Sequence, residues 1–62
     1  VYYNLACIAA LTDETEDALD WLEKAVARGY QNWQAIQTDP DLINIRGTER
    51  YRRLIADNTQ QP

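Results

Sequence analysis

Five acidic residues lie close together early in the chain, and carboxylates at this density could bind a hard cation such as calcium. They are Asp13, Glu14, Glu16, Asp17 and Asp20. A calcium-binding EF-hand loop needs ligands at alternating positions, a central glycine and a terminal glutamate over about twelve residues. This segment has neither the glycine nor the spacing. Acidic residues at the start of a helix stabilise its positive end, which explains them more simply. No metal site is predicted.

The single cysteine, Cys7, could in principle act as a nucleophile. A nucleophilic thiol is activated by a neighbouring base or by a lowered pKa, and the sequence contains no histidine to serve as that base. Its apolar surroundings in the sequence favour a small buried hydrophobic residue instead. One cysteine also excludes an intramolecular disulfide and a cysteine-based zinc site, and it fits a reducing compartment. We therefore predict a cytoplasmic protein that is not an enzyme, with no catalytic residue and no cofactor.

Four arginines gather in the second half of the chain and could hold a phosphate or an acidic peptide. They are Arg46, Arg50, Arg52 and Arg53. No glycine-rich phosphate loop is present. Pairing with the acids of residues 14–28, or with Asp39 and Asp41, is the simpler explanation. The formal net charge of the 62 residues is −4, so the chain lacks the overall basic character typical of nucleic-acid binding.

The spacing of the apolar residues along the chain predicts an all-α fold, and its helices would position the residues named above. Helices are expected over residues 1–11, 14–28, 32–38 and 49–57, with a turn or short helix after Pro40 that ends at Gly47. Asp13 and Glu16 are spaced as a capping box for the second helix. Asn32, Asp39 and Thr48 are expected to cap the later ones, and Gly29 to end the second helix.

The first predicted helix is apolar on almost every side, with Asn4 as its only polar residue. Such a helix must be covered all round, so Leu5 and Ile8 are both expected to be buried. The second helix can cover only one face, and the other face needs a neighbour that the chain does not obviously supply. No apolar run reaches the roughly 18 residues that span a membrane, so no membrane insertion is expected. The larger aromatic residues are expected in the core, with Trp21 serving the packing of the terminal segment: Trp21, Tyr30, Trp33 and Tyr51.

The pattern of residues 1–56 resembles one tetratricopeptide repeat followed by a capping segment. The segments that carry the resemblance are Tyr3-Asn4-Leu5-Ala6, Ala18-Leu19, Lys24-Ala25 and, further on, Thr38-Asp39-Pro40-Asp41-Leu42 with Arg46. Small residues at Ala6, Ala18 and Ala25 match the positions where the two helices of a repeat approach closely. The later segments resemble the end of many bacterial arrays of this family. The chain departs from the family in its Gly29-Tyr30 exit and in having Ala9 late in the first helix.

The resemblance implies an antiparallel hairpin over residues 1–30, two or three short capping helices over 31–57 and a frayed tail over 58–62. It implies a non-catalytic protein-interaction or scaffold module, because a single repeat cannot bury its own faces. Its partner would be a protein or peptide, preceding repeats of the same chain, or a second copy. The face implied to bind is Tyr3, Cys7, Ala10 and Leu11. The alternative is the C-terminal tail of a larger bacterial enzyme or regulator whose chemistry lies upstream.

Overall fold

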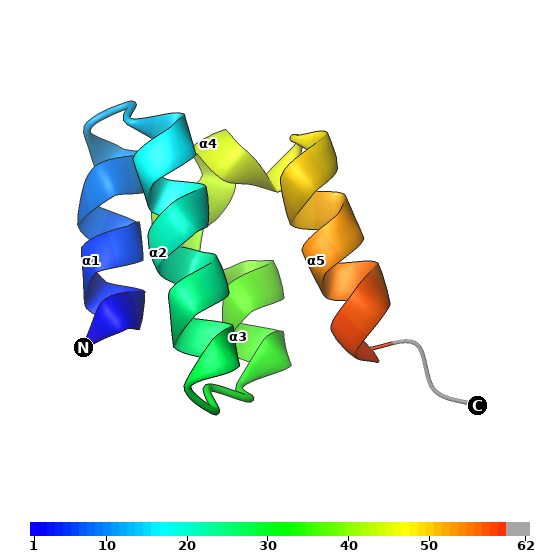
Figure 1. Ribbon diagram of the computed structural model, residues 1–62. Helices are drawn as coiled ribbons and strands as arrows, with labels where there is room; N and C mark the ends of the chain where they lie inside the picture. Colours follow the sequence, from blue (N-terminus) through cyan, green and yellow to red (C-terminus); the bar gives the residue numbers. More distant parts are fainter. Residues whose placement is uncertain (60–62) are drawn as a thin grey trace.

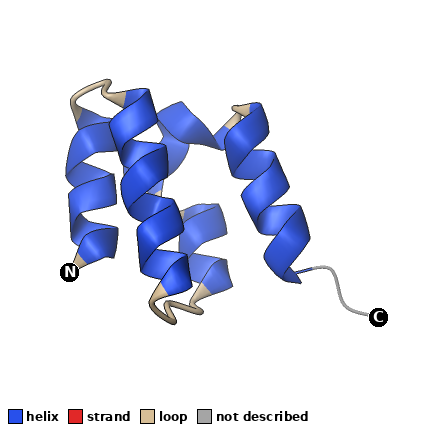
Figure 2. Cartoon of the chain, viewed as in Figure 1, coloured by secondary structure: helices blue, strands red, loops and turns tan. Residues whose placement is uncertain are grey.

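The computed structural model describes residues 1–59, and every regular element within them is helical (Figure 1 and Figure 2). In chain order the elements are α1 (Tyr2–Leu11), α2 (Thr15–Ala27), α3 (Trp33–Thr38), the 3-10 turn η1 (Pro40–Leu42), α4 (Ile43–Arg46) and α5 (Glu49–Thr59). The predicted all-α fold is confirmed. The tail predicted for residues 58–62 begins within α5, and its last three residues lie outside the described part of the chain.

Helices α1 and α2 lie side by side and antiparallel, and they share the most extensive contact between elements (Figure 1). The residues at this contact are mostly small. Five alanines of the two helices are at most 6% exposed: Ala6, Ala9, Ala10, Ala18 and Ala25. Small side chains let helix axes approach closely, so the pairing depends on backbone proximity more than on long side chains.

The capping box predicted at the start of α2 is not formed. Asp13 has a left-handed backbone with φ of 62°, whereas an N-cap residue needs an extended one. The N-cap of α2 is Glu14, which makes no side-chain capping hydrogen bond. The Asp13 carboxylate instead accepts a hydrogen bond from the Asn44 side-chain amide at 3.1 Å. Asp13, which was expected to cap α2, therefore links the turn before α2 to α4.

The other predicted caps are confirmed. The side chains of Asn32 and Thr48 each accept a hydrogen bond from the amide three residues later, at 3.1 and 3.2 Å. Asp39 accepts from the amide two residues later at 2.9 Å, with Pro40 in the first position of η1. Gly29 has φ of 105°, a backbone conformation that residues with a Cβ rarely adopt. The glycine therefore allows the chain to leave α2.

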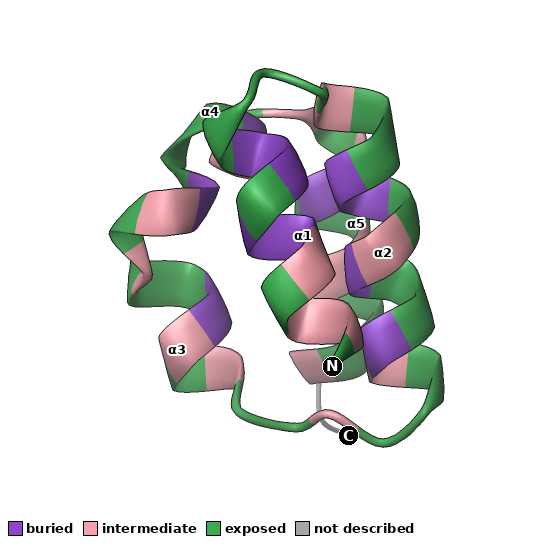
Figure 3. Cartoon of the chain, turned by 90° about the vertical axis from the view of Figure 1, so that its left-hand side faces the viewer, coloured by how far each residue is buried: buried purple, intermediate pink, exposed green. Residues whose placement is uncertain are grey.

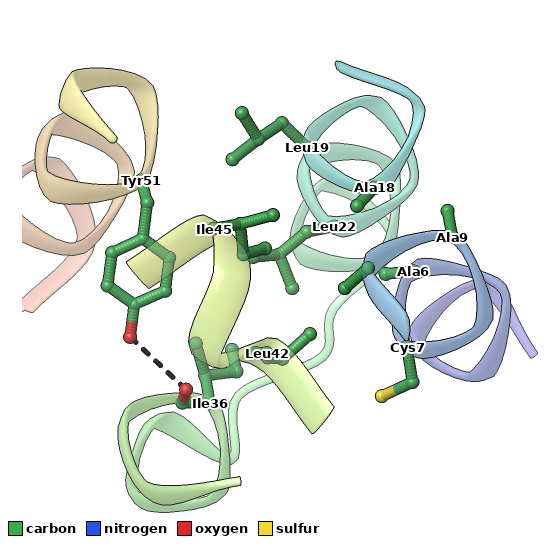
Figure 4. Packing of buried hydrophobic residues seen from close by; sticks show 11 residues of the cluster. Ala6, Cys7, Ala9, Ala18, Leu19, Leu22, Ile36, Leu42, Ile45 and Tyr51 are labelled. Carbon is green, nitrogen blue, oxygen red and sulfur yellow. Dashed lines mark hydrogen bonds between the residues drawn. The ribbon is translucent and has the colours of Figure 1, made fainter. Parts of the chain in front are cut away.

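The core lies where α1 and α2 meet the segment from α3 to α4 (Figure 4). Its largest fully buried side chains come from both halves of the chain: Leu19, Leu22, Ile36, Leu42 and Ile45. Tyr51 of α5 reaches the same cluster, is 4% exposed, and donates its hydroxyl hydrogen bond to the Ile36 carbonyl at 3.1 Å. Residues 31–57 therefore complete the core that the α1–α2 hairpin begins.

The four aromatic residues expected in the core are buried to different degrees. Tyr51 is buried, whereas Trp21, Tyr30 and Trp33 are half-buried at its margin. Trp21, expected to serve the terminal segment, stacks on Tyr2 of α1 with ring centroids 5.7 Å apart. Its position beside the main stripe of α2 turns the indole toward α1.

Candidate functional site

The four residues of the predicted binding face are placed differently by the fold. Tyr3 contacts Asp39 just before η1, Cys7 lies near Asp39 and Asp41, and Ala10 bonds to α4; Cys7 and Ala10 are buried. The Asn44 amide donates a hydrogen bond to the Ala10 carbonyl at 3.1 Å. Leu11 is 61% exposed. The chain's own residues 39–44 therefore occupy most of this face, and Leu11 is its accessible member. A protein-binding role for the four residues stays a prediction.

Asp39 is the centre of the polar contacts on the covered side of α1. Its carboxylate accepts hydrogen bonds from the Tyr3 hydroxyl at 2.8 Å and from the Asp41 amide at 2.9 Å. The Tyr3 ring also stacks on Tyr30, with centroids 4.6 Å apart. These bonds stabilise the ionised carboxylate, so they hold the pKa of Asp39 below its ordinary value, the Asp41 amide having the largest effect. Burial, followed by the bond to Asp39, raises the pKa of Tyr3.

Cys7, Asp39 and Asp41 bring one sulfur and two carboxylate oxygens within 4.8 Å of one another. A metal ligand must be a thiolate, but burial and then the charge of Asp39 raise the pKa of Cys7. The Cys7 sulfur lies 3.9 Å from the carboxylate that Tyr3 already engages. The arrangement favours a protonated thiol, so we interpret this cluster as a tie between α1 and η1. Reactivity and metal binding are both disfavoured by the same burial.

The opposite side of α1 is exposed (Figure 3), and three of its four exposed residues are aliphatic. Val1, Ile8 and Leu11 are 95%, 59% and 61% exposed, and Asn4 is exposed between them. Residues 1, 4, 8 and 11 are separated by three, four and three positions, the spacing of the contact seam in a coiled coil. We call these four residues the α1 seam. Only Leu11 of this seam belongs to the face predicted from the sequence, because that prediction treated the helix as uniformly apolar and did not use the 3-4-3 spacing of these four residues.

The expectation that Leu5 and Ile8 are both buried is wrong for Ile8. Leu5 lies half-buried at the margin of α1, but Ile8 points away from α2 and η1. The reason is geometric: the alanines of α1 occupy the side that meets the chain's other helices, and the larger aliphatic side chains occupy the side that does not. Ile43 of α4 is a further exposed aliphatic residue, 66% exposed. It follows Leu42 of the core and precedes Asn44, whose amide bonds to α1.

The arginines of the second half divide into two pairs. Arg50 forms ion pairs at 2.8 to 3.0 Å with three acids of α2: Glu16, Asp20 and Glu23. Arg53 pairs with Glu49 on its own helix at 3.0 Å. Arg46 and Arg52 donate to backbone carbonyls instead. The predicted pairing with the acids of the second helix is confirmed for Arg50. The hydrogen bonds to those acids raise the pKa of its guanidinium, that to Asp20 having the largest effect.

Comparison with known proteins gives one partial similarity. Over 53 residues, 86% of this chain, the sequence is 32% identical to a chloroplastic protein of Arabidopsis thaliana. The chain spans 16% of the length of that relative. No protein-family model matches the sequence, and no solved structure matches the fold. Among residues 1–59, no helix has the length and apolar character needed to cross a membrane.

Proposed function

We propose that this chain is a non-catalytic protein–protein interaction module that associates with a second copy of itself through the α1 seam. The observation that carries the proposal is the 3-4-3 spacing of four exposed residues, three on α1 (Asn4, Ile8 and Leu11) and one, Val1, at its N-cap. Helices with this spacing pair by inserting each seam residue between residues of the facing helix. Pairing would remove from water the aliphatic side chains that the fold leaves exposed, which is a favourable change.

Charge favours a second copy as the occupant. The chain carries a net charge of −4, so two copies repel one another at long range, and acidic residues at the contact would add to that repulsion. Residues 1–12 contain no charged side chain. A two-fold dimer brings the same patch of each copy together, so an uncharged patch avoids like-charge contact by construction. Asn4 lies within the seam, and a single polar residue at such a position favours one register of pairing.

The remaining parts of the proposal follow the resemblance to a terminal tetratricopeptide repeat. Residues 31–57 would act as the cap of a bacterial, cytoplasmic scaffold. Supporting this, η1 and α4 cover the side of α1 that holds Tyr3, Cys7 and Ala10, while α5 lies against α2 and α4. A cap of this kind shields the last apolar face of a helical array from solvent. The α1 seam is then the open end of the unit.

Sedimentation equilibrium over a dilution series tests the proposal. The wild-type chain is expected to shift from dimer to monomer on dilution. Ile8→Asp and Leu11→Asp each place an acid on the seam, so both are expected to be monomeric at concentrations where the wild type is dimeric. Both should stay helical by circular dichroism, because Ile8 and Leu11 are exposed.

Gln34→Asp is the matched control, since Gln34 is an exposed residue of α3 and the change adds the same charge. It is expected to dimerise as the wild type does. A wild-type chain that is monomeric throughout the series contradicts self-association, and so does an Ile8→Asp variant that dimerises as well as the control.

The alternative is the C-terminal tail of a larger bacterial enzyme or regulator whose chemistry lies upstream. The Arabidopsis relative favours it to this extent: the matching segment forms a small part of a longer protein. The coding sequence that flanks this segment distinguishes the two. Further copies of the repeat upstream support the scaffold, whereas a catalytic motif upstream supports the enzyme or regulator.

A further inference from the structure

A shallow surface pocket of about 360 Å³, open to solvent and called the cavity below, lies between α5 and the segment from α3 to α4, on a different part of the molecule from the α1 seam. Figure 1 shows α5 running apart from α3, and the cavity lies along that side of α5. Its lining comes from three helices: Gln37 of α3, Arg46 of α4, and Tyr51, Arg52, Ile55 and Ala56 of α5. Ligand pockets of drug size begin at roughly 300 Å³, so this cavity suits one or two side chains.

The floor of the cavity is apolar and firmly held. Tyr51 is buried, and its hydroxyl is fixed by the hydrogen bond to the Ile36 carbonyl, so the ring cannot swing out without breaking that bond. Ile55 is half-buried and packs against the core, while Ala56 is exposed and leaves open space beside it. An apolar side chain entering the cavity would contact this ring and these aliphatic groups and displace water from them.

The rim carries two guanidinium groups without an acidic partner in the described part of the chain. Arg46 donates to the Ile36 and Asp39 carbonyls at 3.2 and 2.6 Å, and its buried Nε has no hydrogen-bond partner among the described residues. Arg52 donates to the Gly47 carbonyl at 3.0 Å and is otherwise exposed. Within residues 1–59, neither forms an ion pair. The charge of Arg46 acts on the nearby Asp39 carboxylate and is partly offset by it, so the exposed Arg52 supplies most of the positive charge at the rim.

We propose that this cavity binds an acidic peptide segment of a partner protein. An aliphatic or aromatic side chain of the peptide would lie against Tyr51, Ile55 and Ala56. A neighbouring carboxylate would face the Arg52 guanidinium, with the Arg46 charge behind it. Opposite charge across the contact steers the partner and selects against basic peptides, while the apolar floor supplies contact area. The α1 seam carries no charge, so the two surfaces take different partners.

Fluorescence anisotropy with two short labelled peptides tests this proposal. One peptide contains leucines flanked by aspartates, and the other has lysines in place of the aspartates. The acidic peptide is expected to bind and the basic one not to bind. Raising the salt concentration from about 0.05 M to about 0.5 M is expected to lower the affinity for the acidic peptide several-fold, because salt screens the exposed pairing with Arg52.

Two variants test whether the peptide binds at the cavity. Arg52→Glu reverses a charge at the rim and is expected to lower the affinity for the acidic peptide at least about tenfold. Ala56→Phe fills the space beside Tyr51 from an exposed position and is expected to abolish binding with the helical circular dichroism unchanged. Arg53→Glu is the control for charge, since Arg53 lies on the same helix, outside the cavity lining, and the charge change is identical; because it also removes the pair with Glu49, its helicity is checked by circular dichroism. It is expected to change affinity less than about twofold.

Absence of binding by the acidic peptide overturns the proposal, as does equal weakening by Arg52→Glu and Arg53→Glu. The result is independent of self-association. Ile8→Asp is expected to bind the peptide as the wild type does, and Arg52→Glu is expected to dimerise as the wild type does. A failure at one surface is therefore distinguishable from a failure at the other.

Discussion

The α1–α2 hairpin and α5 belong to the same small molecule, but they are attached to its core by different means. The hairpin buries a set of alanines, whose small side chains allow its helices to approach closely. Helix α5 makes fewer contacts and is held by Tyr51 in the core and by Arg50 on the surface. The hairpin is therefore sensitive to added volume, whereas α5 is sensitive to the loss of particular polar contacts.

The largest effect is expected from enlarging an alanine of the hairpin. Ala6 is fully buried between α1 and its neighbours, so Ala6→Leu must push the helices apart. We expect a loss of about 3 kcal/mol in the free energy of unfolding, measured by urea denaturation, because overpacking a close-packed core strains it. Ala27→Leu adds the same atoms at an exposed position of α2 and should cost almost nothing. Equal stability of the two variants would show that the hairpin is not closely packed.

A smaller effect is expected from removing Arg50. This side chain bonds to Glu16, Asp20 and Glu23, but all four groups are at least one-third exposed. We expect Arg50→Ala to cost about 1 kcal/mol, because single exposed ion pairs contribute less and three converge here. Arg53→Ala removes only the Glu49 pair within α5 and should cost less. Urea denaturation at low and high salt checks this, since the difference between the variants should shrink as salt rises.

The smallest effect is expected from the pH dependence of the tie between η1 and α1. The pKa of Asp39 is lowered in the folded chain, so its contribution to stability is present above its ordinary pKa of 3.8 and is lost as pH falls through the folded-state value. Asp39→Asn should remove this loss of stability at acidic pH and leave the rest of the dependence of stability on pH unchanged. Thermal unfolding from pH 2 to pH 7 measures it. An identical acid profile for both chains would show that Asp39 does not stabilise the fold.

Much of the fold could be predicted from local sequence. Gly29, Asn32, Pro40 and Thr48 mark helix ends through their own backbone preferences, and all four do so in the structure. Asp13 departs from its predicted role because its hydrogen-bond partner, Asn44, lies 31 residues further along the chain. Local spacing contains no information about such a partner.

The candidate surfaces were harder to predict than the helices. The sequence indicated that α1 needed a neighbour, but of the predicted face Tyr3, Cys7, Ala10 and Leu11, the first three lie on the side that residues 39–44 cover, and Leu11 is exposed. Which side stays open depends on how the later segment folds back. The cavity beside α5 depends in turn on the angle at which Tyr51 and Arg50 hold that helix, and both act through residues distant in sequence.

The most direct test of the α1 seam is nuclear magnetic resonance of the isotope-labelled chain at high and low concentration. Self-association through the seam predicts concentration-dependent shifts at Asn4, Ile8 and Leu11, with the amides of α5 unchanged. It also predicts that these shifts disappear in Ile8→Asp. Shifts confined to α5, or spectra identical at both concentrations, would contradict the proposal that the exposed face of α1 meets a second copy.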